Sequence, residues 1–268
     1  MTIIASFSSH GSPGVSTSSL ALALTWENPV ILIEADTSAP SSVMAGFMQV
    51  SVPYRRGISY LIESFHTSGP SLDSLWAQLI PLAQDPVSVS GSPYPKHLLA
   101  AAASPKAATG YTTFWTDLMS VCYEAEKAGV DTIIDLGRIT DKDPRLPILS
   151  ASTITLAHLK PTLMDISAAQ ENIAHLSKYL ENSGKQETFR LVLHESTPGA
   201  NYPAREVAQV LNTPVAATLP YDPVQAAYYS YGIAPGHKRK TKYTAALRQY
   251  ASTVQHLARQ SRTILEEV

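Results

Sequence analysis

The sequence has one cysteine, Cys122, in 268 residues. A disulfide framework and a cysteine-rich zinc or iron–sulfur site are therefore excluded. Charged residues are also scarce, at 16% of the chain, against about 25% in an average soluble domain. The 20 Lys and Arg residues nearly balance the 22 Asp and Glu residues. The chain is not a bulk polycation, so affinity for nucleic acid or an acidic membrane would need a local basic patch.

Long apolar runs are absent as well. No segment approaches the ~18 apolar residues that span a bilayer, and residues 1–7 lack the basic start and apolar stretch of a signal peptide. We therefore expect a cytoplasmic protein. Hydrophobic residues make up 44% of the chain, which favours a folded chain over a disordered one. Because no linker or internal repeat is visible, we expect a single domain over residues 1–268.

Short apolar runs mark the expected strands. Residues 2–7 and 30–34 are β-rich runs that do not alternate in polarity, as in strands buried on both faces. A Ser/Gly/Pro turn and a helical segment around residues 20–24 separate them, which makes a βαβ unit. The alternation continues and predicts an α/β fold, a doubly wound and mostly parallel sheet with flanking helices. The later strands are expected at 131–137, 152–157, 189–193 and 214–219, and the later helices at 114–128, 162–180 and 204–211.

Two segments fit this alternation less simply. Residues 52–113 contain seven prolines, so their helices must be short; a helical spacing is visible over 72–80 and a short strand over 87–91. At the other end, residues 243–268 carry apolar side chains at steps of three and four, which predicts one long helix. We expect this helix to pack on the body of the protein. A helix lying on a membrane and a dimer contact remain open alternatives.

The first turn contains the most informative motif, His10-Gly-Ser-Pro-Gly-Val-Ser-Thr17. A glycine-rich loop before a helix lets backbone N–H groups converge on an anion, and phosphate is the natural guest. A nucleotide-binding P-loop has a lysine where Val15 stands, followed by a hydroxyl that Ser16 supplies. A structural turn that only caps the helix is the alternative. The candidate phosphate-binding residues are Gly11, Ser12, Pro13, Gly14, Val15, Ser16 and Thr17.

Acidic residues follow two of the expected strands. Glu34 and Asp36 end the strand at 30–34, and Asp135 lies in the strand at 131–137. Ligands bind outside the carboxyl ends of strands in open α/β sheets, so these acids and the first turn are expected to face one crevice. Asp135 could hold Mg²⁺ through water. A turn or a helix cap is the plainer role for any one of them.

In this order, the motifs resemble the ParA/MinD ATPases, the family with a deviant Walker A loop. The resemblance rests on residues 10–17, Ile-Glu-Ala-Asp at 33–36, Ile-Ile-Asp at 133–135, and the segments 191–194 and 214–223. It implies a P-loop fold, ATP and Mg²⁺ as cofactors, and a homodimer. Ser16 and Asp135 then resemble the metal-binding hydroxyl and the Walker B acid, and Asp36 the acid that organises the attacking water. The positions that hold adenine in the family correspond to His194, Pro220, Tyr221 and Asp222.

Both lysines of the family motif are missing. Val15 stands at the P-loop lysine and His10 at the lysine that reaches across the dimer, while Glu34 replaces the first aspartate of the acid pair. Those lysines neutralise the transferring phosphoryl group, and losing one such group typically costs ~10²–10³ in rate. The sequence therefore predicts weak or slow ATP hydrolysis. Members of this family with altered P-loops include the TadZ/CpaE-like localisation factors of pilus and secretion systems. The resemblance therefore favours that role.

The expected function is a degenerate nucleotide-binding switch that positions or regulates a partner machine of the secretion, pilus or partition type. The alternatives are a pseudo-ATPase scaffold without nucleotide and a DNA-partition ATPase. A basic run precedes the last helix and could bind nonspecific DNA or an acidic membrane, placing the protein at the nucleoid or membrane periphery. A solvated helix start is the plainer interpretation. The run comprises Lys238, Arg239, Lys240 and Lys242.

Overall fold

The computed structural model describes residues 2–11, 14–51, 55–82, 94–102, 113–234 and 241–266, with side chains as far as 261. These residues form an eight-stranded sheet in the order β3-β4-β2-β5-β1-β6-β7-β8. Neighbouring strands are parallel, except that β3 runs antiparallel to β4. The strands are β1 Ile3–Ser8, β2 Val30–Glu34, β3 Ile80–Pro81, β4 Lys96–Leu99, β5 Asp131–Arg138, β6 Ile154–Leu159, β7 Phe189–His194 and β8 Val215–Leu219.

The centre of the sheet is apolar on both faces, as the continuous runs in the sequence predict. Residues of β1, β2 and β6 are buried along their whole length. Strand β1 lies between β5 and β6, and β5 also pairs with β2. In this register Asp135 lies opposite Ser6 on one side and Glu34 on the other. The carboxyl ends of β1, β2 and β5 therefore meet at one edge.

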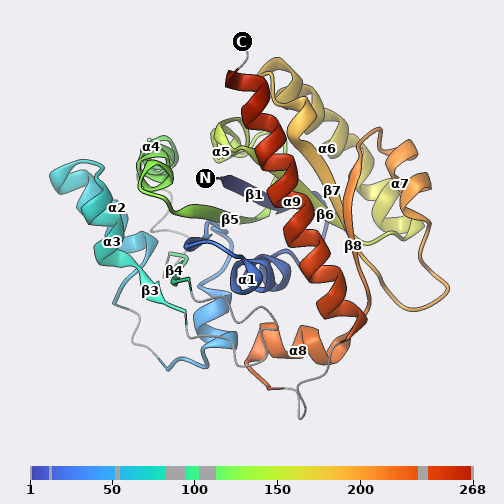
Figure 1. Ribbon diagram of the computed structural model, residues 1–268, viewed down its shortest axis with the longest axis horizontal. Coiled ribbons are helices and arrows are strands. Elements are labelled where there is room, and N and C mark those ends of the chain that lie inside the picture. The colour runs from blue at the N-terminus through green and yellow to red at the C-terminus, as the bar shows by residue number, and fades with distance from the viewer. Residues whose placement is uncertain are drawn as a thin grey trace.

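Helices cover both faces of the sheet (Figure 1). One face packs on α1, α8 and α9, and the other packs mainly on α2 to α7. A π-helical segment, Val43–Phe47, and a 3₁₀ turn, Gln186–Thr188, complete the fold. The helices are α1 Val15–Thr25, α2 Ile58–Ser68, α3 Leu72–Gln78, α4 Phe114–Lys127, α5 Leu146–Ala151, α6 Leu163–Asn182, α7 Ala204–Val210, α8 Pro223–Tyr231 and α9 Lys242–Glu266.

The segment 52–113 differs from the sequence-based expectation. It contains a full helix, α2, and an inner strand, β4, neither of which was predicted. The helical spacing over 72–80 stops at Gln78, because Ile80 pairs antiparallel with Leu98. The strand predicted at 87–91 lies outside the described residues.

Helix α9 packs on the protein body through its apolar stripe. Tyr243, Leu247, Tyr250 and Val254 are buried, and the helix contacts β8 and α1. In Figure 1 it crosses the sheet face beside α1. None of the helices in the described ranges has the length and apolar character needed to cross a bilayer.

Candidate functional site

The loop from β1 to α1 is described at its two ends, up to Gly11 and from Gly14 onward. The backbone at both ends suits an anion-binding loop, called the cradle below. The Ser8 hydroxyl donates to the carbonyl of Gly11, 3.0 Å away. Gly14 has φ 88°, a left-handed conformation suited to glycine, and its carbonyl accepts the Ser18 N–H at 2.9 Å. The amino terminus of α1 thus begins directly at the loop, where unpaired N–H groups favour an anion. The predicted phosphate-binding residues 12 and 13 lie outside the described part of the chain.

The three residues after Gly14 point in different directions. Val15 is only 5% exposed, so the side chain at the family's lysine position is packed into the protein. Ser16 is half-buried, and its hydroxyl is near enough to Asp135 to favour the charged form of that carboxylate. Thr17 Oγ1 lies 3.0 Å from Ser230 Oγ in α8. Only Ser16 therefore presents its side chain to the acids at the strand ends.

Asp135 is the buried carboxylate of the site. Burial raises its pKa to about 7, although the nearby Ser16 hydroxyl and the hydrogen bond from the Gly137 N–H favour the charged form. The nearby charges of Glu34 and Asp36 raise the pKa further. The Gly137 N–H lies 2.9 Å from Asp135 Oδ1. Near neutral pH the Asp135 carboxyl group can therefore keep its proton or lose it and bind a cation.

Glu34 is buried too, but its carboxylate is occupied by the next segment of chain. It accepts hydrogen bonds from the hydroxyls of Ser41 and Ser42 and from the Val43 N–H, at 2.9 Å for Ser42 and 3.0 Å for Val43. Burial raises the pKa of Glu34, and these bonds oppose the shift. The side chain that replaces the family's first aspartate thus anchors the start of the π-helical segment.

Asp36 is half-exposed and lies against the backbone near the end of β5. Its Oδ1 accepts the Ser38 N–H at 2.8 Å. The carboxylate fills space beside Gly137, where a β-carbon would lie 2.2 Å from Asp36 Oδ2. Asp36, Gly137 and Asp135 are thus adjacent, as the strand order predicts.

Arg145, which the sequence analysis did not select, joins the loops that carry these acids. The guanidinium is buried and donates to the carbonyls of Ala35 at 2.8 Å, Leu136 at 2.6 Å and Arg138 at 2.8 Å. It also forms an ion pair with Asp143 at 2.7 Å. No local pattern marks this arginine, since the three carbonyls that it binds lie in β5 and just after β2.

Two histidines border the cradle from β6 and β7. His158 Nδ1 lies 2.9 Å from His194 Nε2 and 3.3 Å from Ser18 Oγ. Burial and neighbouring positive charge lower the pKa of both rings, to about 4 for His194, where Lys160 supplies the charge. His194 also lies beside Gly14, where a β-carbon would be 3.7 Å from its Nδ1. Both rings are therefore neutral near pH 7.

The hydrogen bonds assign a tautomer to this pair. Ser18 donates its hydroxyl proton to the Val15 carbonyl, so the bond between the rings needs a proton on one of the two histidine nitrogens. Within the described residues, His158 Nε2 is buried with no partner. The favourable arrangement leaves that atom bare and puts the proton on His158 Nδ1, which donates to His194 Nε2. His194 then carries its own proton on Nδ1, the atom next to Gly14.

The segment after β8 contributes less directly. Leu219 pairs with His194, so residues 220–222 leave the sheet at the same edge. The Asp222 carboxylate caps α8 by accepting the Val224 and Gln225 N–H groups at 3.2 and 3.1 Å. Tyr221 is 58% exposed and Pro220 is half-buried. Of the predicted basic run, Lys242 is exposed at the start of α9, and positions 238–240 lie outside the described residues.

A cavity of about 450 Å³ opens beside Ser16, between the π-helical segment and α8. Within the described ranges, no group of three or more His, Cys, Asp or Glu residues could hold a metal. Hydroxyl and carboxylate oxygens nevertheless suit Mg²⁺, which keeps several waters and shares phosphate ligands. Ser16 and Asp135 therefore fit a Mg²⁺ ion that arrives with a phosphate.

The parallel sheet, the glycine loop at its carboxyl edge and the strand-end acids define a P-loop NTPase fold. Among solved structures the fold is that of the ParA/MinD ATPases. A ParA family ATPase from Chlorobium tepidum superposes with a TM-score of 0.70 at 13% identity, covering 94% of this chain and 98% of that one. MinD from Pyrococcus horikoshii in complex with Mg-ADP gives 0.69 at 14% identity, covering 97% and 98%.

A Cyanothece McdA variant in complex with ATP is similar to the same degree, with a TM-score of 0.68 at 14% identity and 96% coverage of both chains. No protein-family model matches the sequence, and neither does any curated protein. The likeness is therefore one of fold, and the roles of individual residues must be argued from the site.

Proposed function

We propose that this protein is a nucleotide-dependent switch of the ParA/MinD type, with a degenerate phosphate loop that binds ATP weakly and hydrolyses it slowly. The observation that carries the proposal is the proximity of Ser16, in the first turn of α1, to the buried Asp135, whose charged form its hydroxyl favours. This pair supplies the oxygen ligands for Mg²⁺ exactly where an α1 amino terminus favours phosphate. Asp36, adjacent to Asp135, is the candidate for orienting water.

The absence of both family lysines determines how strongly we expect the site to bind nucleotide. Val15 is apolar and buried, so it offers no charge to the phosphates. Backbone N–H groups, Ser16 and a Mg²⁺ ion would have to supply the attraction, and His194 adds a neutral ring near the Gly14 end of the loop. Binding should therefore depend on Mg²⁺ more strongly than in a site with a lysine. The segment 220–222, with His194, is proposed to border the base.

We further propose a homodimer and a protein partner, since a switch acts through contacts that change with the nucleotide. The leading role is to position a secretion or pilus machine, as in TadZ/CpaE-like factors, and DNA partition is the second. The basic run at 238–242 would bind nonspecific DNA or an acidic membrane and place the protein at the nucleoid or membrane periphery. Substituting all four cations should then remove salt-sensitive binding to both surfaces.

One observation favours a different class of function. Burial of Val15 and the raised pKa of Asp135 both weaken a phosphate site, which would suit a scaffold that binds no nucleotide. Calorimetric titration of ATP and ADP, with and without Mg²⁺, separates the two. The switch predicts binding that Mg²⁺ strengthens and that Ser16→Ala weakens, with Ser252→Ala, at an exposed position of α9, as the control. No binding at millimolar nucleotide would favour the scaffold.

A further inference from the structure

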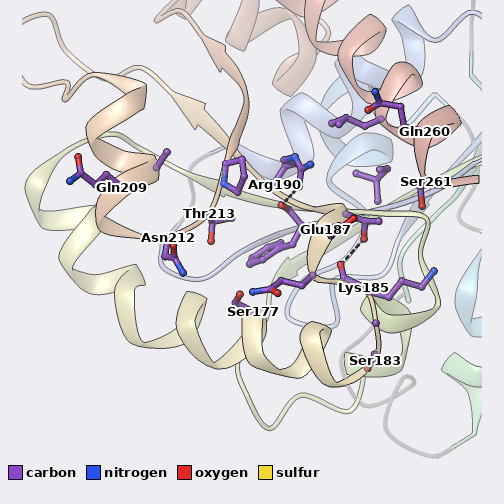
Figure 2. A pocket seen from close by; sticks show the side chains of 18 residues that line it. Ser177, Ser183, Lys185, Glu187, Arg190, Gln209, Asn212, Thr213, Gln260 and Ser261 are labelled. Atoms are coloured by element: carbon purple, nitrogen blue, oxygen red, sulfur yellow. Dashed lines mark hydrogen bonds between the residues drawn. The ribbon is translucent and has the colours of Figure 1, made fainter. Parts of the chain in front are cut away.

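A second cavity, of about 1060 Å³, lies at the amino-terminal ends of β6, β7 and β8 (Figure 2). This is the opposite edge of the sheet from the phosphate loop. Ile154 begins β6, Arg190 lies near the start of β7, and Pro214 precedes β8. The ends of α6 and α7 and the later part of α9 complete the walls. The volume suits a small organic molecule, for which pockets of ~300–1,000 Å³ are typical.

The lining combines apolar and polar groups. Ile154, Pro214 and Leu257 contribute hydrocarbon surface, while the rest of the wall is largely hydroxyl and amide side chains. The charged side chains lining it are Lys185, Glu187 and Arg190, and Figure 2 labels all three around the cavity. The site therefore offers an apolar wall and a cationic group within one enclosure.

Arg190 is the most unusual of these groups. It is half-buried, and its Nη1 donates to the carbonyl of the preceding residue, Phe189, at 2.8 Å. Across the described ranges this is the one hydrogen bond of its guanidinium, and no carboxylate forms an ion pair with it. A guanidinium has five N–H donors. None of the unpaired nitrogens of Arg190 is among the buried unpartnered atoms of the described residues, so they remain accessible to a ligand in the cavity. Partial burial lowers the pKa of Arg190, although Glu187 opposes the shift.

We propose that this cavity is a second ligand site, which binds a small organic anion with an apolar body. A carboxylate head would pair with the free N–H groups of Arg190, since the planar guanidinium can donate two parallel hydrogen bonds to the two carboxylate oxygens. The apolar body would lie against Ile154 and Leu257. The site lies at the far end of the sheet from Ser16, so it does not rest on nucleotide binding.

Octanoate is a suitable probe because it joins a carboxylate to a short apolar chain. Calorimetric titration of the full-length protein should show that octanoate binds more tightly than acetate, which lacks the body, or octan-1-ol, which lacks the charge. Arg190→Gln should weaken octanoate binding by about tenfold to a hundredfold, the value of a charged hydrogen bond. The same change should leave octan-1-ol binding unaltered.

Two further variants test whether octanoate binds in this cavity or to exposed arginines elsewhere on the protein. Arg248→Gln removes an exposed arginine of α9 that does not line the cavity, and it should bind octanoate like the wild type. Gln260→Trp should obstruct the cavity from α9 and weaken both octanoate and octan-1-ol. Saturating Mg-ATP should leave octanoate affinity unchanged.

The proposal is overturned if the wild type binds no octanoate, or if Arg190→Gln binds it as tightly while remaining folded by circular dichroism. It also fails if Gln260→Trp has no effect, or if octan-1-ol binds the wild type as tightly as octanoate. Displacement of octanoate by Mg-ATP would assign the anion to the phosphate loop instead.

Discussion

The carboxylate of Asp36 occupies the space that a side chain on Gly137 would need. A β-carbon there would lie 2.2 Å from Asp36 Oδ2 and 2.4 Å from Asp36 Cγ, and Gly137 has φ 60°. The same glycine donates its N–H to Asp135. One residue without a side chain therefore sets how two acids of the candidate site approach each other.

Gly137→Ala should consequently lower the free energy of unfolding by about 3 kcal/mol, from left-handed strain and the steric clash together. Gly184→Ala is the matched control, because Gly184 has φ 67° and open space where its β-carbon would lie; about 1 kcal/mol is expected there. Urea unfolding of both variants gives the comparison.

Adding Asp36→Ala to Gly137→Ala should recover part of the loss, since it removes the two closest contacts. Equal destabilisation at Gly137 and Gly184 would contradict the proposed clash. So would strict additivity of the two substitutions.

Asp135 should give the protein a measurable pH dependence of stability. Its pKa is raised from 3.8 to about 7 by burial, so the folded state holds a proton that the unfolded state loses above about pH 4. This contribution is fully present below pH 4 and is lost as the pH rises through 7, and it amounts to about 4 kcal/mol at most.

His158 and His194 act in the opposite direction, because burial lowers their pKa values. The effect of Asp135 should therefore be measured as the difference between the wild type and Asp135→Asn, from urea unfolding between pH 4 and 8. The wild type should lose stability relative to the variant as the pH rises. A difference independent of pH would refute the raised pKa.

Val15→Lys should tighten Mg-ATP binding by about tenfold or more, through a charged contact to the phosphates. Val15→Met is the control, as it adds length to the same buried position without charge. Hydrolysis should rise only if Asp36 still orients water, which Val15→Lys/Asp36→Ala tests under saturating ATP. A folded Val15→Lys protein with unchanged affinity would mean that phosphates do not bind at the amino terminus of α1.

The ring of His194 should stay neutral from pH 8 down to about pH 5, because burial and Lys160 lower its pKa to about 4. Nitrogen NMR of the histidine rings should place its proton on Nδ1. Lys160→Met should raise this pKa by removing the nearby positive charge. Titration of His194 near 6.5 in the wild type would contradict the buried pair.

The α/β fold was predictable because β1, β2 and β5 to β8 are short runs rich in β-branched and apolar residues, which can be recognised without any other part of the chain. Strand β4 was not, since Lys96 and His97 begin it and only the free edge of β2 makes it a strand. The proximity of Ser16 to Asp135 follows from the topology, because α1 begins after β1 and β1 pairs with β5.

Arg145 and His158 could not be selected in the same way. Each bonds to groups that are distant in sequence: the Ala35 carbonyl for Arg145, and the Ser18 hydroxyl and the His194 ring for His158. Local sequence patterns do not reveal contacts between residues that are distant in the sequence.

The three carbonyl groups to which Arg145 donates hydrogen bonds limit which parts of such a switch could move. They belong to the chain just before Asp36 and to the chain on either side of Gly137. A buried clasp of this kind fixes the spacing of Asp36 and Asp135 before any ligand arrives. A conformational change caused by the bound phosphates would then have to occur in loops that Arg145 does not bind, such as those after β7 and β8. A partner protein is therefore expected to contact these loops.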